Sequence, residues 1–112
     1  MSIQHAESGE IIDIRPLEDR LAQSITKTLV KADNIEIIRM IVPVGKEIMP
    51  HKVTCPITIQ CLEGCVDFQA YGTWQTLEQG QMLFLEPDVL HALKGVREAS
   101  LLISIFLPRS VI

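Results

Sequence analysis

Short runs of aliphatic residues, separated every few positions by proline or glycine, make up most of the chain. The runs are too short for helices and are rich in Ile and Val, whose branching at Cβ suits a pleated strand. Turn residues between such runs favour strands joined by tight connections. The pattern predicts strands at residues 11–14, 25–31, 35–42, 57–62, 66–71, 73–77, 82–85 and 99–107.

One segment, P16-L-E-D-R-L-A-Q23, has a helical pattern, with Pro16 in the first turn and Leu17 and Leu21 four residues apart. Many short strands without alternating helices indicate an all-β protein, an antiparallel sandwich or barrel. We expect a single domain over residues 1–112, with an N-terminal arm at 1–23 that carries the helix and a barrel at 24–108.

The last predicted strand, A99-S-L-L-I-S-I-F-L107, is apolar on both faces. Leu101, Ile103 and Ile105 lie on one face, and Leu102 and Phe106 lie on the other. A strand with one solvated face alternates apolar and polar residues, so this strand should be covered on both sides. In so short a chain the second cover is expected to be another subunit, which predicts a homodimer.

Charge and composition restrict the classes of partner that the protein is expected to bind. The formal net charge is -4 and the ten Lys and Arg are scattered, so no basic surface is expected for nucleic acid. The first ten residues lack the features of a signal peptide, and the longest apolar run is too short to span a bilayer, so we expect a cytoplasmic protein with no membrane partner.

The three cysteines, Cys55, Cys61 and Cys65, cannot all pair with one another. Their spacing also lacks the C-x2-C pairs of a structural zinc site. Neither a disulfide framework nor a zinc-binding module of that kind is expected, and a buried thiol more often behaves as a small hydrophobe.

Two stretches carry a resemblance to a known family. The first is G45-K-E-I-M-P-H51-K-V-T-C-P-I-T-I-Q-C-L-E-G64, and the second is G80-Q-M-L-F-L-E-P-D-V-L-H91, with a short hairpin between them. Their glycines, histidines and separation resemble the two motifs of a small single-domain cupin over nearly the whole chain. This resemblance implies an antiparallel double-stranded β-helix, the jelly-roll barrel of cupins.

Only part of the cupin metal site is matched by residues of this chain. Metal-binding cupins hold Fe, Mn, Zn, Ni or Cu with two histidines and a glutamate of the first motif and one histidine of the second. His51 and His91 match, whereas Val53 and Ile57 occupy the positions of the second histidine and the glutamate. A third ligand would have to come from elsewhere: Glu47, which would suit Fe(II), or Cys61, which would suit Zn.

The opening G9-E-I-I-D-I-R-P-L17, the core from His51 to Gly64 and the H91-A-L93 ending of the second motif also resemble a group of small bacterial cupin-domain proteins without an assigned reaction. Two functions therefore stay open. One is a binding module that holds a small, partly anionic ligand, or a weakly held and sub-stoichiometric divalent metal, in the barrel mouth. The other is a metal-dependent enzyme of the dioxygenase or isomerase type, with the metal on His51, His91 and a nonstandard third ligand. The residues expected to line the site are His51, His91, Met49, Val53, Ile57 and Cys61.

Overall fold

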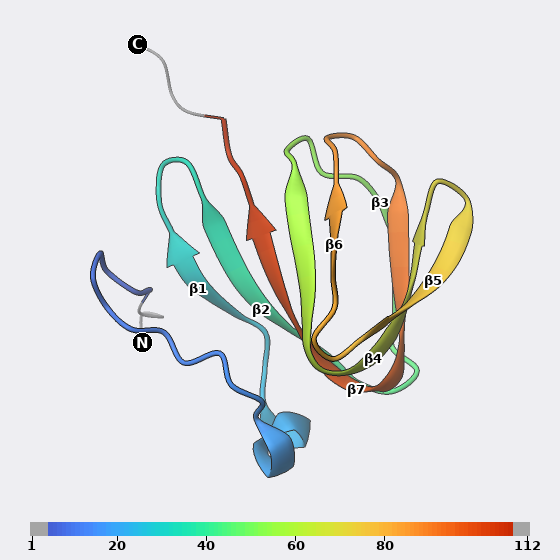
Figure 1. The fold of residues 1–112 in the computed structure, drawn as a ribbon, viewed down its shortest axis with the longest axis horizontal. Coiled ribbons are helices and arrows are strands. Elements are labelled where there is room, and N and C mark those ends of the chain that lie inside the picture. Colours follow the sequence, from blue (N-terminus) through green and yellow to red (C-terminus); the bar gives the residue numbers. More distant parts are fainter. Residues whose placement is uncertain (1–4, 109–112) are drawn as a thin grey trace.

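The computed structural model describes residues 5–108, which form seven antiparallel strands and one short 3-10 helix (Figure 1). The elements are η1 (Glu18–Gln23), β1 (Lys27–Lys31), β2 (Glu36–Val42), β3 (Glu47–His51), β4 (Ile57–Ala70), β5 (Thr73–Glu78), β6 (Met82–Leu85) and β7 (His91–Ile105).

Two long strands, β4 and β7, pair along their length and bend in the middle, so that each belongs to both walls of a barrel. One wall has the order β1-β2-β7-β4-β6 and uses the second half of β7 and the first half of β4. The other wall has the order β3-β7-β4-β5 and uses the remaining halves. The fold is thus an antiparallel all-β barrel of two facing sheets, as the sequence predicted.

Gly64 allows β4 to bend against β7. The pairing of the two strands shifts register three times between Cys61 and Val66, and such bulges bend a strand. Gly64 has φ +81°, and a Cβ placed on it would lie 2.6 Å from the Cα of Ala99. Since no side chain fits there, the glycine permits the close approach of the two strands at the corner of the barrel.

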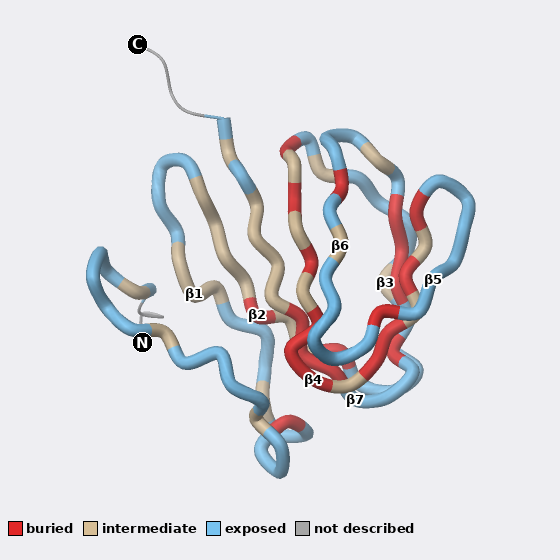
Figure 2. Tube along the Cα trace, in the orientation of Figure 1, coloured by how far each residue is buried: buried red, intermediate tan, exposed pale blue. Residues whose placement is uncertain are grey.

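The core lies between the two walls and is formed by buried apolar residues of the strands, which Figure 2 colours red. Its fully buried centre includes Ile59, Phe68 and Leu101. Figure 2 shows the barrel corner as buried, whereas β2 and the end of β7 are only half-buried. The wall that contains β2 is therefore the less covered of the two.

The structure differs from the local predictions at several elements. Residues 11–14 form no strand, and Ile11 is 97% exposed, because an apolar run becomes a strand only where another strand pairs with it. The predicted runs 57–62 and 66–71 are one strand, β4, since the bulged bend keeps their pairing to β7 continuous. Strand β3 was not among the predicted strands, because its short run lies between turn residues. It pairs with the start of β7. The predicted helix is a 3-10 helix over Glu18–Gln23.

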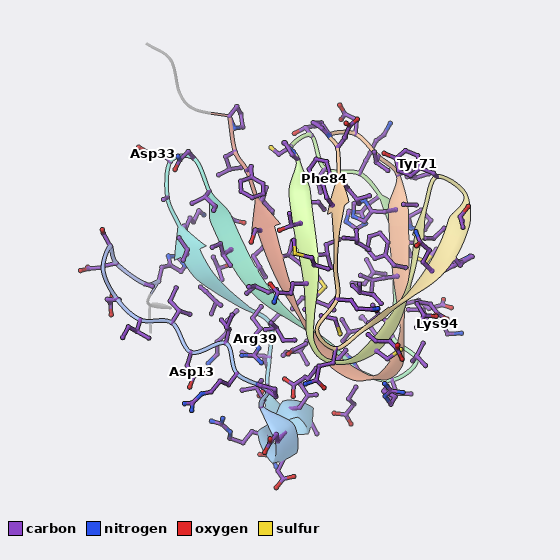
Figure 3. The ribbon with its side chains drawn as sticks, viewed as in Figure 1. Asp13, Asp33, Arg39, Tyr71, Phe84 and Lys94 are labelled. Carbon is purple, nitrogen blue, oxygen red and sulfur yellow. The ribbon has the colours of Figure 1, made fainter. Side chains whose placement is uncertain are left out.

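A buried polar cluster, formed by Arg39, Glu63 and Ser100, fastens the N-terminal arm to the barrel corner. The Glu63 carboxylate accepts hydrogen bonds from the N–H groups of Leu17 and Glu18 at 2.9 and 3.1 Å, and from the Ser100 hydroxyl at 2.7 Å. Arg39 donates to the backbone carbonyl of Arg15 at 2.8 Å, and Figure 3 shows Arg39 close to the turn into η1. The first four residues of the predicted arm lie outside the described residues.

Among residues 5–108, no helix has the length and apolar character needed to cross a membrane.

Candidate ligand-binding site

Strands β3 and β7 bring His51 and His91 together. His51 is the last residue of β3, His91 is the first residue of β7, and the two are directly opposite in the antiparallel pairing. Their ring centroids are 4.3 Å apart, with the ring planes at 55°. Two imidazoles that lie 40 residues apart in the sequence therefore form one pair at the barrel mouth.

Each imidazole is held through one nitrogen by the backbone carbonyl two residues before it. The Nδ1 atom of His51 lies 3.1 Å from the carbonyl oxygen of Met49, and that of His91 lies 2.9 Å from the carbonyl oxygen of Val89. A carbonyl oxygen can only accept, so Nδ1 carries the proton in both rings. In its neutral form each ring then has its free lone pair on Nε2, available to a donor or a metal ion.

His91 is the more enclosed member of the pair. It is 5% exposed, and the ring of Phe68 stacks on it with a centroid distance of 5.6 Å and an angle of 10°. Burial lowers the pKa of His91 and the nearby His51 lowers it further, against the opposing effect of the Val89 carbonyl. Because the result is a pKa below the ordinary value, His91 is neutral near pH 7.

An apolar cavity of about 190 Å³ opens beside the histidine pair, inside the barrel. Both walls contribute to it through aliphatic side chains that point inward. Its lining residues are Ile38, Met40, Ile48, His51, Val53, Ile57, Ile59, His91, Leu93, Ile103 and Ile105. The structure thus brings together four of the six residues expected at the site, because Val53 and Ile57 line the same cavity as the two histidines.

Met49 lies elsewhere, on the outside of the barrel. It is 72% exposed and lines a shallow groove with Glu47 and Trp74. Strict alternation would have placed positions 47, 49 and 51 on one face. The pairing of β3 with β7 shifts register between Ile48 and His51, so Ile48 lines the cavity together with His51, and Met49 does not.

Cys61 lies on the inner face of β4 but is packed into the core, away from the cavity lining. Its Sγ donates to the carbonyl oxygens of Glu63 and Gly64 at 3.4 and 3.5 Å. Burial raises the pKa of the thiol to about 11. Cys61 is therefore a protonated core thiol, which is neither a nucleophile nor a prepared metal ligand.

The donor set does not fit the metal cage of cupins. Within residues 5–108, no three His, Cys, Asp or Glu side chains are grouped so that they could hold a metal ion. Glu47 faces outward, 3.8 Å from the ammonium of Lys94, and Cys61 is enclosed in the core. The site provides two imidazole nitrogens and an aliphatic wall, which is fewer donors than a resident zinc or iron takes from its protein.

A second hollow, which the sequence did not predict, adjoins the histidine pair at the barrel rim. It has a volume of about 340 Å³ and includes Gln69, Tyr71, Asp88 and His91 among its lining residues. Tyr71 and Asp88 have φ values of +53° and +64°, and the N–H of Asp88 donates to the carbonyl of Val53 at 2.8 Å. Figure 3 shows Tyr71 at the rim, in the turn that joins β4 and β5.

The arrangement of the strands can be compared with known structures. A protein of unknown function from Streptococcus pyogenes has a TM-score of 0.75 and 21% identity, with 98% of each chain covered. A cupin superfamily protein from Desulfitobacterium hafniense has a TM-score of 0.71 and 14% identity, with 75% of this chain and 77% of that chain covered. The chain has the cupin fold.

Another cupin-fold match is the salicylate 1,2-dioxygenase from Pseudoaminobacter salicylatoxidans, solved as a mutant in complex with gentisate. Its TM-score is 0.64 at 18% identity, and the match covers 66% of this chain and 20% of that chain. Searches of protein-family models and of curated proteins find no match. At these identities the likeness concerns the cupin barrel itself, and the site has to be interpreted from its own residues.

Proposed function

We propose that this cupin is a binding module for a small molecule with an apolar body and one polar head. The observation that carries the proposal is the apolar cavity of about 190 Å³ with two imidazoles in its wall. Binding sites of this kind use apolar surface for affinity and a few placed polar groups for orientation. His51 and His91 are the polar groups, and the aliphatic side chains of both walls supply the apolar surface.

The cavity volume limits the size of the ligand. An apolar protein cavity of about 150 Å³ takes a benzene molecule. A volume of about 190 Å³ therefore suits a single six-membered ring with one or two substituent atoms. Gentisate, the compound bound to the dioxygenase of similar fold, is an aromatic acid built on such a ring.

The protonation state of His91 determines which kind of polar head group the ligand can have. As a neutral ring with Nδ1 bound to a carbonyl, it accepts a hydrogen bond at Nε2, for example from a phenolic or carboxylic O–H. An anionic head would instead require a protonated imidazole. Since the pKa of His91 is lowered, an anion should bind together with one proton, and its affinity should rise as the pH falls.

The metal-dependent enzyme is the less favoured alternative. The Nδ1–carbonyl contacts of both histidines are of the kind that orients metal ligands in proteins. The described residues place no third metal-ligating side chain beside the two histidines, which disfavours a resident catalytic metal. Near-stoichiometric Zn, Ni, Fe or Mn in the protein as purified, without added metal, would overturn the binding-module proposal.

The direct test is chemical-shift perturbation of the labelled protein with benzene, phenol and benzoate as probes. We expect phenol to bind more tightly than benzene near pH 7, because only phenol has an O–H to donate. Benzoate should gain up to about tenfold in affinity per pH unit on acidification below neutrality, as expected when one proton is taken up with the ligand.

His91→Phe keeps an aromatic ring beside Phe68 but removes Nε2, so it should abolish the preference for phenol over benzene. The control is His5→Ala, since His5 is exposed in the N-terminal segment, away from the cavity lining. Equal binding of phenol by the wild type and the His91→Phe variant would refute the assigned role of His91. No binding of any of the three probes would refute the proposed cavity.

A further inference from the structure

Two hollows on the outside of the β3-β7-β4-β5 wall join to form one groove. The hollow at the barrel rim and the shallow groove beside Met49 share Pro50 and Gln69 in their linings. Gln69 lies between the buried residues Phe68 and Ala70 of β4, so its side chain points away from the core. We call the joined surface the rim groove. The other lining residues that matter for its chemistry are Glu47, Tyr71, Trp74, Asp88 and Leu90.

Tyr71 occupies a backbone position that favours other residue types. Tyr71 and Gly72 are the two residues between β4 and β5, and both have positive φ, +53° and +74°. A hairpin loop of this kind, the type I′ turn, prefers Asn, Asp or Gly at its first position. A bulky residue is strained there, and Tyr71 is 73% exposed, so packing against the core does not account for it. Strained residues of this kind cluster at ligand-binding positions.

The rim groove has a second exposed aromatic residue, Trp74, which lies opposite Gln69 in the pairing of β4 and β5. Met49 and Leu90 are exposed apolar side chains in the same lining. The faces of Trp and Tyr rings attract cations and also pack against apolar chains. The groove therefore suits a ligand that combines positive charge with an apolar body.

The formal charges in the rim groove are negative. Its described lining includes two carboxylates, Glu47 and Asp88, and no Lys or Arg. Within residues 5–108, no Lys or Arg forms an ion pair with Asp88. Glu47 lies 3.8 Å from the ammonium of Lys94, in a solvent-exposed pair of the kind that contributes little. The groove is thus complementary in charge to a cationic ligand.

The two carboxylates belong to different ends of the rim groove. Asp88 lines the rim hollow together with Pro50, whereas Glu47 lines only the other part. Glu47 and Pro50 are three residues apart on β3, which corresponds to about 10 Å along an extended strand. Between these ends the lining is apolar, aromatic or neutral. This order of groups matches a molecule with a positive charge at each end of an apolar chain.

We propose that the rim groove binds a linear diamine or polyamine, with its methylene chain against the rings of Tyr71 and Trp74. An ammonium group can only donate, and the carboxylates of Asp88 and Glu47 accept from the two ends. A basic peptide has the same charges, but it also brings backbone N–H and C=O groups, for which the middle of the groove has few partners. The inference does not depend on the ligand proposed for the cavity inside the barrel.

Trp74 is the only tryptophan of the chain, so its fluorescence reports directly on the rim groove. The probe is the five-carbon diamine cadaverine, at low ionic strength, where surface charges are least screened. Pentanediol and glutarate have chains of the same length with neutral and anionic ends. We expect a saturable change with cadaverine and none with the other two at the same concentrations. Amide chemical shifts of the labelled protein should place the change at residues 69–74 and 88–92.

Asp88→Asn keeps a residue type that tolerates positive φ but removes one charge, and it should weaken cadaverine binding about three- to fivefold. The matched control is Asp33→Asn, which removes the same charge from an exposed residue in the loop between β1 and β2. Figure 3 shows Asp33 well away from Tyr71. The control should bind cadaverine as the wild type does. Equal losses in the two variants would mean a response to net charge alone and would overturn the site.

Tyr71→Asn tests whether Tyr71 is retained for binding rather than for folding. Asn suits the first position of the turn, so this variant should have a higher melting temperature than the wild type and should bind cadaverine less tightly. A lower melting temperature with unchanged binding would give Tyr71 a packing role and overturn the inference. It is also overturned if the wild type shows no saturable response to cadaverine, or if a blocked Lys-Ala-Lys peptide binds more tightly than cadaverine.

Discussion

The guanidinium of Arg39 lies 3.0 Å from the carboxylate of Glu63, and each of these side chains is only 8% exposed. Arg39 comes from β2 and Glu63 from the bend of β4, so the pair joins two strands across β7. The same carboxylate accepts the backbone N–H groups of Leu17 and Glu18. One buried ion pair thereby fixes the barrel corner and the start of η1 together.

Breaking this pair should destabilise the protein strongly. Arg39→Met leaves the Glu63 carboxylate buried without its partner, and removal of one member of a buried pair costs about 3–5 kcal/mol. Urea denaturation should show a loss of this size in the free energy of unfolding. Arg15→Met is the control, because the Arg15–Asp13 pair is at the surface, with side chains 85% and 58% exposed. A similarly small change in both variants would show that the buried pair contributes little.

Glu63 should also make stability depend on acid pH. Burial alone raises the pKa of the carboxyl, but the hydrogen bonds from Leu17, Ser100, Glu18 and Arg39 outweigh burial, and the pKa is lowered. An acid with a depressed folded pKa stabilises the protein above the unfolded value, about 4.5, and this contribution is lost as the pH falls through the folded pKa. Glu63→Gln should therefore show a smaller loss of stability between pH 5 and pH 2 than the wild type does, when each is measured by urea denaturation.

His91 should make the stability of the protein depend on pH in a separate range, higher than that of Glu63. Its folded pKa lies below the ordinary value of 6.5, so the unfolded chain binds the proton first on acidification. The free energy of unfolding should fall as the pH drops below about 6.5 and should level off below the folded pKa. A nuclear magnetic resonance titration of the His91 ring should give a midpoint below 6.5. His91→Gln should flatten the stability curve in this window, and a midpoint above 6.5 would contradict the role given to burial.

Rebuilding the cupin ligand set should create a metal site. Val53 and Ile57 line the same cavity as the two histidines, so Val53→His together with Ile57→Glu adds donors beside them. Titration calorimetry should show at least tenfold higher affinity for Ni or Zn, which corresponds to about 1.4 kcal/mol. The control places the same residue types outside the cavity, as Met49→His with Trp74→Glu, and should show no gain. Equal metal affinity in the two double variants would mean that the cavity cannot gather four donors.

Alanine substitutions at Gly64 and Gly72 should separate the effect of backbone strain on stability from the effect of steric crowding. Both have positive φ, +81° and +74°, so an alanine is strained at either position. A Cβ at Gly72 meets no atom within 4 Å, whereas a Cβ at Gly64 runs into the backbone of Glu98 and Ala99. Thermal denaturation should show Gly72→Ala modestly destabilised, by about 1 kcal/mol, and Gly64→Ala destabilised far more or unable to fold. Equal effects would mean that β7 can move away from the bend without cost.

The sequence by itself determined the all-β class, because alternation and turn chemistry are local properties of the chain, and the resemblance of its two motifs to cupins implied the type of barrel. The pattern predicted β6 with its observed bounds, Met82–Leu85, and the resemblance placed His51 and His91 in motifs whose strands lie side by side in the fold. Residues 11–14 have an apolar pattern but form no strand in the fold, because no other strand pairs with them.

Only the tertiary structure decided which side chains share a space. The register shift between Ile48 and His51 reverses the expected alternation, which turns Met49 outward and Ile48 into the cavity. Arg39, Glu63 and Ser100 lie on three strands, and no local spacing relates them before the strands pair. Strand alternation is set by each residue's neighbours in the chain, whereas bulges, bends and buried polar pairs depend on contacts between distant segments, which exist only once the barrel has closed.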